Sequence, residues 1–339
     1  MCVRRLRPGA EPECRTVAGR LWNSKVSDMS SEDKSNNNAS PDGTNKWFQA
    51  DAFMGIVNAI VTVLLSGICC LITSLPLVLV MLVVNDVSYW PLYFAAAVLS
   101  SPSVAALYAI FRDHPALLSQ DSRVRMKRML DAASASAEGD GDGRPAFPPD
   151  WLAAPYVRQD ASVAMFRPYF AAYAKLWTRS FAQGLTFGLI AFALLYNSLL
   201  VSQFSWGIYV VIPFAVCGVF LLAASSIAMV LVVEYPKAKY LSVLKNSVLL
   251  SVRRVYILLI ALVALVAYGY GLFRWTMLMG VLGTGVLWYL IWGASRWQAQ
   301  VLFSRMAAES GDDRIVEMYQ AVPVSRGFGF LSGITDYKQ

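Results

Sequence analysis

Residues 166–196, with the sequence FRPYFAAYAKLWTRSFAQGLTFGLIAFALLY, are the stretch that decides the fold. Large apolar residues in and just before its first half recur at steps of three and four, which places them on one helical face: Val163, Phe166, Phe170, Tyr173 and Trp177. Basic residues such as Lys175 are interleaved with them, and no charged residue follows Arg179 until Glu234. We therefore expect a helix on the membrane surface to lead directly into a helix that crosses the membrane.

The same order of segments recurs at residues 235–273. A basic amphipathic segment, PKAKYLSVLKNSVLLSVRR, is followed by VYILLIALVALVAYGYGLF, which carries no charge. Asn246 and Ser247 interrupt the apolar stripe of the first part, where they can cap a helix or hydrogen-bond to a neighbouring helix. Such interfacial helices can simply lead a chain into the bilayer. The duplication favours a docking role, in which both helices, with Lys175 and Arg179, face a cytoplasmic partner.

The composition is typical of a membrane protein. Of the 339 residues, 57% are hydrophobic and 15% are charged, with a mean hydropathy of +0.49. Soluble domains carry about 25% charged residues. The net charge of +7 is explained by basic loops beside the membrane, so we expect no nucleic-acid partner.

Six uncharged apolar segments predict six transmembrane helices in an all-α bundle. The first, residues 53–84, has 32 residues, or roughly 48 Å as a helix against the ~30 Å of a bilayer core. We therefore expect Pro76 to kink or break this span. The other five segments are residues 90–111, 181–204, 206–233, 255–273 and 275–295. Together with the two cytoplasmic interfacial helices, they predict a polytopic membrane helix bundle.

The distribution of basic residues predicts the orientation. Eight Lys and Arg residues precede the first span, ten lie in residues 112–180, five in residues 234–254 and five from Arg296 onward. The connections on the opposite side carry only Arg274. This asymmetry predicts a multi-pass protein of the plasma membrane with both termini in the cytoplasm.

The chain is expected to divide into five sections: a disordered cytoplasmic tail (1–46), the first two spans (47–113), a flexible cytoplasmic loop (114–160), the amphipathic and remaining spanning helices (161–297) and a cytoplasmic tail (298–339). Because residues 1–28 differ in composition from the Ser/Asn-rich stretch after them, we expect translation to begin at Met29. His114, the only histidine, is expected at the surface. A basic cluster in the loop predicts attraction to anionic lipid heads or, alternatively, a site for a phosphorylated ligand: Arg123, Arg125, Lys127 and Arg128.

The sequence contains no motif for catalysis. No Asp, Glu, Lys, Arg or His falls inside the six predicted spans, which weighs against proton-driven transporters and ion pumps. The sequence also lacks a Walker loop, a TVGYG filter, HExxH and GxSxG motifs and the kinase motif set. Cys69, Cys70 and Cys217 lie in apolar runs, where thiols act as small apolar side chains. We therefore expect no enzyme, no cofactor and no metal site.

Small and polar residues within the spans predict close helix packing. Gly184 and Gly188 form a GxxxG pair, and two further groups of small residues follow: Ala223, Ala224, Ser225, Ser226 and Ala228, then Gly280, Gly283 and Gly285. Such faces pack helices within the bundle or, alternatively, form the seam of a homo-oligomer. Polar residues predict interhelical hydrogen bonds or, less favoured, the lining of a cavity for a polar solute: Asn58, Thr62, Gln183, Asn197 and Gln203.

Four stretches resemble the YesL-like family of bacterial integral membrane proteins, a domain of unknown function: ITSLPLVL (72–79), SSPSVAALYAIFRD (100–113), FRPYFAAYAKLWTRSFAQG (166–184) and YLSVLKNSVLLSVRRVYILLI (240–260). The resemblance covers residues 51–297, with motif positions at Pro76, Pro102, Tyr108, Phe170, Asn246 and Ser247. Residues 77–99 and 131–150 depart from the family pattern as insertions. Residues 77–99 can therefore belong to one full span or to two.

The resemblance implies an accessory or permease-like component associated with carbohydrate uptake in a bacterial cell, because family members often occur beside genes for sugar ABC transporters. Components of such a transporter are then expected partners, in addition to the lipid bilayer. The chain lacks the EAA-type loop with which sugar ABC permeases dock their ATPase, which weakens this function. Two alternatives remain: a membrane scaffold or regulatory protein that docks a cytoplasmic partner, and a lipid-interacting protein without a transported solute.

Overall fold

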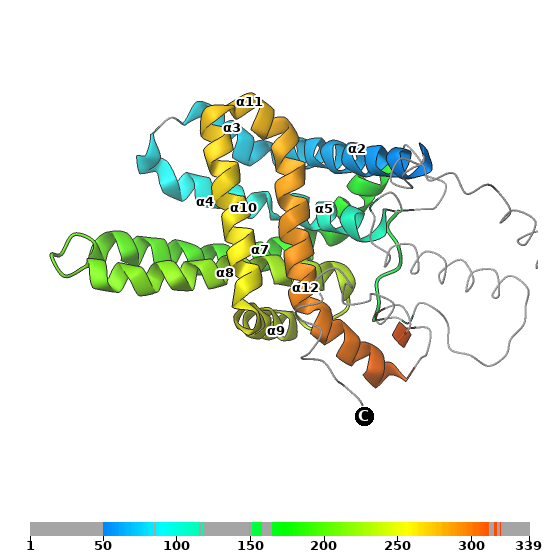
Figure 1. Cartoon of the computed structure of the whole chain (residues 1–339). Helices are drawn as coiled ribbons and strands as arrows, with labels where there is room; N and C mark the ends of the chain where they lie inside the picture. Colours follow the sequence, from blue (N-terminus) through cyan, green and yellow to red (C-terminus); the bar gives the residue numbers. More distant parts are fainter. Residues whose placement is uncertain are drawn as a thin grey trace, which may run out of the picture. The chain divides into compact units, whose positions relative to one another are not determined.

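The computed structural model describes residues 50–84, 86–114, 151–157 and 165–311, together with residues 117, 149, 315, 316 and 319. This part of the chain consists of helices and turns without a strand, so the all-α prediction is confirmed (Figure 1). From Asp51 on, the helices belong to one unit of the chain. The predictions for residues 1–46, for most of the 114–160 loop with its basic cluster and for the end of the C-terminal tail fall outside the described residues.

Prolines divide the first third of the described chain into short helices. The elements are α2 (Ala50–Thr73), α3 (Leu75–Val83), the 3-10 helix η2 (Val87–Tyr89), α4 (Trp90–Leu99) and α5 (Ser101–Asp113). Each of α3, α4 and α5 has a proline in its first turn. Proline is tolerated there because the first N–H groups of a helix lack an intrahelical acceptor, but it does not continue a preceding helix. The predicted break at Pro76 is confirmed, since Ser74 separates α2 from α3.

The predicted second span, residues 90–111, is not a single straight helix. α4 and α5 are bent by 43° at the break between them, because Pro102 in the first turn of α5 prevents a continuous helix through Ser100. The described helical residues of 77–99 belong to α3, η2 and α4, and α3 packs against α4. α3 and α4 have 9 and 10 residues and reach at most about 15 Å, half of a bilayer core, so neither spans a membrane alone.

α7 (Phe166–Val201) is one unbroken helix of 36 residues, or about 54 Å. The first predicted interfacial helix, residues 162–180, is therefore not a separate element, since its described part continues directly into the apolar segment. No proline or glycine lies between Pro168 and Gly184, which permits a continuous helix there. The predicted aromatic stripe is exposed at Phe166, Phe170 and Trp177, whereas the buried face of this half carries Tyr169, Ala172, Leu176 and Ser180.

The later helices form two hairpins. After α7 come α8 (Ile208–Glu234), α9 (Tyr240–Arg253), α10 (Val255–Arg274), α11 (Thr276–Leu278), the π-helical η3 (Met279–Gly283) and α12 (Thr284–Ser310). α7 packs along α8, and α10 packs along α12. α9 is a separate helix on α8, which Figure 1 shows nearly end-on beside the start of α10. α12 continues beyond residue 298, the predicted start of the C-terminal tail, and ends at Ser310, which is followed by Gly311 in the left-handed conformation, with φ of 65°.

Five helical stretches are long and apolar enough to cross a membrane: α2 from Gly55, α7, α8, α10 and the continuous stretch from α11 to α12. The bent α4–α5 pair is a sixth if it counts as one span. These lengths and compositions are those of a membrane protein. Figure 1 shows the α7–α8 hairpin running across the direction of α10 and α12, so helix length alone does not give the number of spans. The six-span topology stays a prediction.

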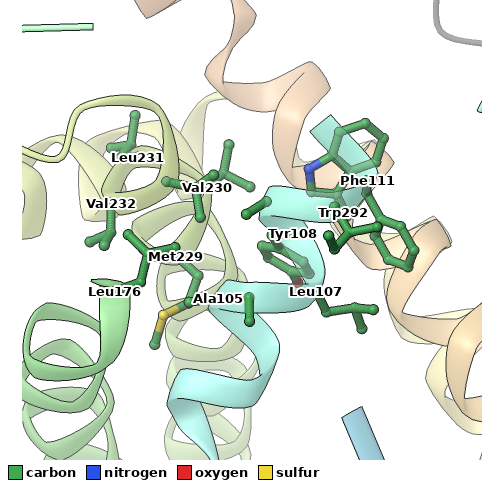
Figure 2. Packing of buried hydrophobic residues seen from close by; sticks show 14 of the residues in the cluster. Ala105, Leu107, Tyr108, Phe111, Leu176, Met229, Val230, Leu231, Val232 and Trp292 are labelled. Atoms are coloured by element: carbon green, nitrogen blue, oxygen red, sulfur yellow. The ribbon is translucent and has the colours of Figure 1, made fainter. Parts of the chain in front are cut away.

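The core lies around α5, which is buried along almost its whole length. α7, α8 and α12 all pack against it. Figure 2 shows the side chains that meet there: Ala105, Leu107, Tyr108 and Phe111 of α5, Leu176 of α7, Met229, Val230, Leu231 and Val232 of α8, and Trp292 of α12. By contrast, large apolar side chains are exposed along the second half of α7, the first half of α8 and α10, where lipid tails would cover them.

Glycines allow close contacts between helices of the bundle. A Cβ atom at Gly184 would lie 2.3 Å from Ser101 Oγ, and one at Gly188 would lie 2.3 Å from a methyl group of Val98. α7 therefore approaches α4 and α5 too closely for a side chain at either position. A Cβ at Gly285 of α12 would lie 2.3 Å from the Val63 carbonyl of α2. The predicted packing role is confirmed for these three glycines.

Candidate functional site

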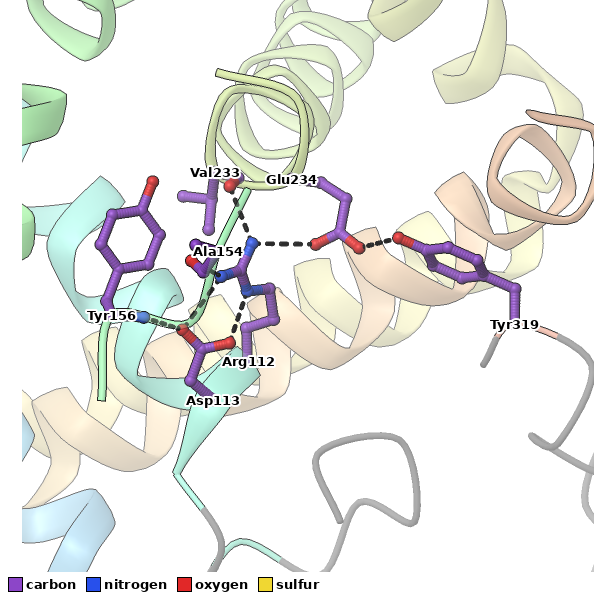
Figure 3. A network of polar contacts seen from close by, with 7 residues as sticks. All are labelled: Arg112, Asp113, Ala154, Tyr156, Val233, Glu234 and Tyr319. Atoms are coloured by element: carbon purple, nitrogen blue, oxygen red, sulfur yellow. Dashed lines mark hydrogen bonds and ion pairs between the residues drawn. The ribbon is translucent and has the colours of Figure 1, made fainter. Parts of the chain in front are cut away.

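A buried ionic cluster forms where the ends of α5 and α8 meet (Figure 3). Arg112 and Asp113 end α5, and Glu234 ends α8. Each of the three residues is at most 2% exposed. Burial of three charged groups requires that each is paired and hydrogen-bonded, so the partners define what the cluster can do.

Five hydrogen bonds match the five N–H donors of the Arg112 guanidinium. The guanidinium makes a bidentate contact with Asp113, at 2.7 Å from Nε to Oδ1 and 2.9 Å from Nη2 to Oδ2. Nη2 also donates to the Ala154 carbonyl at 3.2 Å, while Nη1 donates to the Val233 carbonyl at 2.9 Å and to Glu234 Oε2 at 3.3 Å. The Val233 carbonyl lies in the last turn of α8, where carbonyls lack intrahelical donors and the helix dipole favours a cation.

The acids of the cluster are also held by a loop segment before α7 and by Tyr319. The Tyr156 N–H donates to Asp113 Oδ2 at 2.7 Å. The Ala153 N–H donates to the Glu234 backbone carbonyl at 3.1 Å. Tyr319 donates its hydroxyl proton to Glu234 Oε1. The cluster therefore ties together α5, the loop segment, α8 and Tyr319, which are far apart in the sequence.

The ring of Tyr156 lies close to two cations. Arg112 Cζ is 5.1 Å and Lys175 Nζ is 5.2 Å from the ring centroid, within the range of cation–π attraction. Partial burial raises the pKa of the Tyr156 hydroxyl, and the Arg112 charge offsets part of that rise. The phenol is therefore neutral at neutral pH. Lys175, predicted as a docking residue, has a partner within the chain.

His114, expected at the surface, is buried, so that prediction was wrong. The residue caps the C-terminal end of α5 and is 5% exposed. Because α5 is the innermost helix, its end also lies inside the protein. Burial disfavours the imidazolium form and lowers the pKa of His114. The side chain is therefore neutral at neutral pH.

The contacts of the cluster attach α5, α8 and the loop segment before α7 to one another. All five N–H donors of Arg112 are used in these contacts. No three His, Cys, Asp or Glu side chains within the described ranges lie close enough together to hold a metal ion. Removing one partner of a buried ion pair costs about 3–5 kcal/mol. The cluster therefore fixes the ends of α5 and α8.

The eight residues singled out from the sequence do not form one site. They lie in four helices: Pro76 in α3, Pro102 and Tyr108 in α5, Phe170, Lys175 and Arg179 in α7, and Asn246 and Ser247 in α9. Their environments also differ, with some buried (Pro102, Tyr108 and Ser247), one half-buried (Asn246) and the others exposed (Pro76, Phe170, Lys175 and Arg179). The structure thus does not bring these positions together as a binding or catalytic constellation.

Three polar residues predicted to contact partners or neighbouring helices form hydrogen bonds within the chain, two of them within their own helix. Arg179 donates to the Ala238 carbonyl at 3.3 Å, in the turn between α8 and α9. Ser247 Oγ donates to the Leu244 carbonyl at 2.8 Å, and Asn197 Nδ2 donates at 2.8 Å to the carbonyl four residues earlier. The prediction of interhelical bonds was therefore wrong for Ser247 and Asn197. Such side chains are often satisfied by a carbonyl one turn back in their own helix.

A cavity of about 150 Å³ lies between α8, α10 and α12. Its lining is mostly apolar, and its polar side chains are Ser225, Ser226, Ser295 and Gln298. The small-residue face predicted on α8 contributes Ala223, Ser225 and Ser226 to this lining. The cavity lining contains none of the polar residues that the sequence offered for a solute cavity: Asn58, Thr62, Gln183, Asn197 and Gln203. The cavity therefore suits an apolar group better than a sugar.

α9 has an apolar outer face. Its inner face packs on α8, with Val243, Ser247 and Leu250 buried. The outer face consists of Leu241, Val248, Leu249 and Val252, whose exposed fractions are 73%, 46%, 60% and 58%. Exposed basic residues lie on or beside this face: Lys239, Lys245 and Arg253. This combination is typical of a helix at a membrane interface.

No protein-family model, curated protein or solved structure matches the chain. The class defined by the fold is that of a helical membrane protein, because five helical stretches of the described chain are long and apolar enough to cross a membrane. The resemblance to the YesL-like family and its link to carbohydrate uptake stay predictions.

Proposed function

We propose that the protein is a non-catalytic, multi-pass component of the bacterial plasma membrane and that the outer face of α9 contacts anionic lipid at the cytoplasmic surface. The observation that carries this proposal is the outer face itself, which joins four exposed apolar residues with exposed basic residues. Apolar area left in water costs about 25 cal/mol per Å². At the boundary between headgroups and acyl chains the same area is buried.

Charge complementarity favours anionic over neutral lipid. Lys239, Lys245 and Arg253 are exposed, and each basic residue near an anionic membrane surface contributes about 1 kcal/mol. Most basic residues of the sequence fall on the same side of the predicted spans, which is the side expected to face the cytoplasm. α9 also lies between α8 and α10, two helices of membrane-spanning length, so the outer face is held near the ends of predicted spans.

The competing functions receive less support from the contacts. A scaffold that docks a cytoplasmic protein through Lys175 and Arg179 is disfavoured, because both residues have partners within the chain. The accessory role in carbohydrate uptake, with sugar-transporter components as partners, rests on the resemblance alone. We therefore treat it as an alternative outcome of the experiments.

Hydrogen–deuterium exchange of the full chain in nanodiscs tests the proposal. We expect the amides of α9 to exchange more slowly in discs that contain phosphatidylglycerol than in discs of phosphatidylcholine alone. The double variant Lys239→Glu/Lys245→Glu should lose about 2 kcal/mol of this protection. Arg274→Glu, at the opposite end of α10, is the matched control and should leave the protection of the α9 amides unchanged. Equal exchange of α9 in the two lipids would contradict the proposal.

Affinity purification in a gentle detergent addresses the alternative partners. Under the lipid-contact proposal, we expect the chain to be recovered without a stoichiometric protein partner. Recovery of the solute-binding protein, permease or ATPase of a sugar importer would instead support the accessory role. A stoichiometric complex that survives Lys239→Glu/Lys245→Glu would place the partner elsewhere than on α9.

A further inference from the structure

We infer that the cavity between α8, α10 and α12 holds one acyl chain of an anionic phospholipid, with the lipid phosphate bound at Arg254. This site differs from the outer face of α9 and goes beyond the general lipid contact proposed above. It requires only that the surrounding helices lie in a bilayer. The argument rests on the polarity of the two cavity ends, its size and opening, and the position of one arginine.

The cavity has one polar and one apolar end. α10 and α12 run antiparallel, because Gln298 Nε2 donates to the Arg254 carbonyl at 3.2 Å while Tyr268 and Thr284 share a hydrogen bond of 2.7 Å. Gln298 therefore lies level with the start of α10. Further along α10 and α12, the lining is apolar and includes Leu265 and Trp288. A molecule with a polar head and an apolar tail matches this gradient.

The size and opening of the cavity suit part of an acyl chain. A dry apolar cavity of about 150 Å³ in another protein accommodates benzene, so the present cavity, also about 150 Å³, has room for several methylene groups. Two lining residues, Leu222 and Leu265, are 55% and 39% exposed. The cavity therefore borders the outer surface of these apolar helices. In a membrane, lipid tails are the molecules that cover such a surface.

Arg254 supplies the anion-binding group at the polar end. It lies at the junction of α9 and α10, and its Nη1 donates to the Trp297 carbonyl at 3.2 Å. This bond places Nη1 at the carbonyl of the residue before Gln298, and Gln298, which lines the cavity, donates to the Arg254 carbonyl. Within the described part of the chain, this is the only hydrogen bond of the Arg254 side chain. Its other N–H donors are available to phosphate, which arginine can bind through two parallel hydrogen bonds.

Native mass spectrometry of the full chain, released from nanodiscs with equal amounts of phosphatidylglycerol and phosphatidylcholine, tests the acyl-chain end. We expect the wild type to retain one phosphatidylglycerol in preference to phosphatidylcholine. Ala261→Trp fills the cavity from α10 and should lower lipid retention about tenfold, which corresponds to 1.4 kcal/mol. Ala267→Trp adds the same ring at an exposed position of α10 that does not line the cavity. This control should retain the lipid.

Arg254→Gln tests the phosphate end. The variant should lower the preference for phosphatidylglycerol over phosphatidylcholine about fivefold, as expected for one basic residue at about 1 kcal/mol. Arg274→Gln removes the arginine at the other end of α10 and should keep the wild-type preference. An unchanged preference in Arg254→Gln would overturn the assignment of the phosphate.

A photoreactive acyl chain gives a readout that needs no variant. We expect phosphatidylglycerol with a diazirine in its tail to crosslink residues 257–265 or 288–298 of the wild-type chain. Crosslinks spread evenly over the exposed side of α10, or equal lipid loss in the two tryptophan variants, would overturn the inference. Lys239→Glu/Lys245→Glu should keep the bound lipid. A negative result for lipid contact at α9 is therefore distinguishable from a negative result for the lipid in the cavity.

Discussion

Two segments of the chain share one sequence pattern but differ in structure. In both, a basic amphipathic stretch precedes an uncharged apolar stretch. In the first, α7 runs through the junction as one helix of 36 residues. In the second, the helix breaks at Arg254, which separates α9 from α10. The difference shows that the pattern predicts helix formation and amphipathicity, but not whether the two parts share an axis.

Tertiary contacts at the two junctions account for the difference. In α7, the Ser180 carbonyl accepts a hydrogen bond from Ser101 Oγ at 3.2 Å, and the helix packs continuously on α5. At the second junction, the backbone of Arg254 leaves helical geometry, with φ of −131° and ψ of 70°. Its side chain and its carbonyl both bond to α12, at Trp297 and Gln298. The amphipathic half of α7 thus packs on α5 without a break at its junction, whereas α9 packs on α8 and is separated from α10 at Arg254.

The largest effect is expected from the ionic cluster at the ends of α5 and α8, two helices on which α7 packs. Arg112→Ala leaves Asp113 and Glu234 buried without their shared cation, which should destabilise the protein by about 3–5 kcal/mol. Thermal unfolding in detergent measures the loss. Arg305→Ala is the control, because its ion pair with Glu309 is exposed, at 77% and 59% for the two side chains, and should matter little. Equal shifts in the two variants would contradict the role of the cluster.

Alanine substitutions at glycine sharpen the contrast between the packed α7 and the more exposed α10. Gly184→Ala places a methyl group 2.3 Å from Ser101 Oγ, and such overpacking should cost about 1–3 kcal/mol. Gly269→Ala in α10 meets no atom within 4 Å, so it should stabilise the helix by up to about 1 kcal/mol through helix propensity. Opposite signs in unfolding experiments are the expected result. Stabilisation by both substitutions would mean that α7 does not approach α5 as described.

The helical fold was predictable because local signals were strong. Long uncharged runs predicted helices, Pro76 predicted the break in the first span, and the GxxxG pair predicted close packing. The bend between α4 and α5 has a local cause in Pro102, although the uncharged run of residues 90–111 predicted one span. The continuity of α7 and the break at Arg254 depend on contacts with other helices, which periodicity does not encode.

The candidate sites were less predictable than the helices, because they also depend on contacts between segments that are distant in the sequence. Charged residues at the end of an apolar run normally mark the membrane surface, so nothing in the sequence pairs Arg112 with Glu234 across about 120 positions. One usable signal is that α5 lacks a polar face before Arg112, which predicts a helix buried on all sides together with its end. The cavity required knowledge that α8, α10 and α12 meet, which no local pattern contains.

The two arginines that end the amphipathic stretches allow a direct test of the comparison. Arg254→Gln removes the hydrogen bond to the Trp297 carbonyl and should cost about 1.5 kcal/mol or more, because the donor is charged and half-buried. Arg179→Gln removes a 3.3 Å bond to Ala238 at an exposed position and should cost less than about 1 kcal/mol. Hydrogen exchange should accelerate at residues 252–256 in the first variant only. Faster exchange within α7 in Arg179→Gln would show that the continuity of α7 also depends on a single contact.

His114 adds a pH dependence to the end of α5. Its pKa is lowered by burial, so the folded protein binds a proton there less readily than the unfolded chain does. The His114 contribution to stability is therefore fully present above the unfolded value of about 6.5 and is lost as pH falls toward the folded pKa, by up to about 1.4 kcal/mol per pH unit. Because His114 is the only histidine, His114→Gln should flatten the unfolding temperature between about pH 5 and 6.5. A slope that persists unchanged in this variant would assign the pH dependence to the carboxylates of the neighbouring cluster.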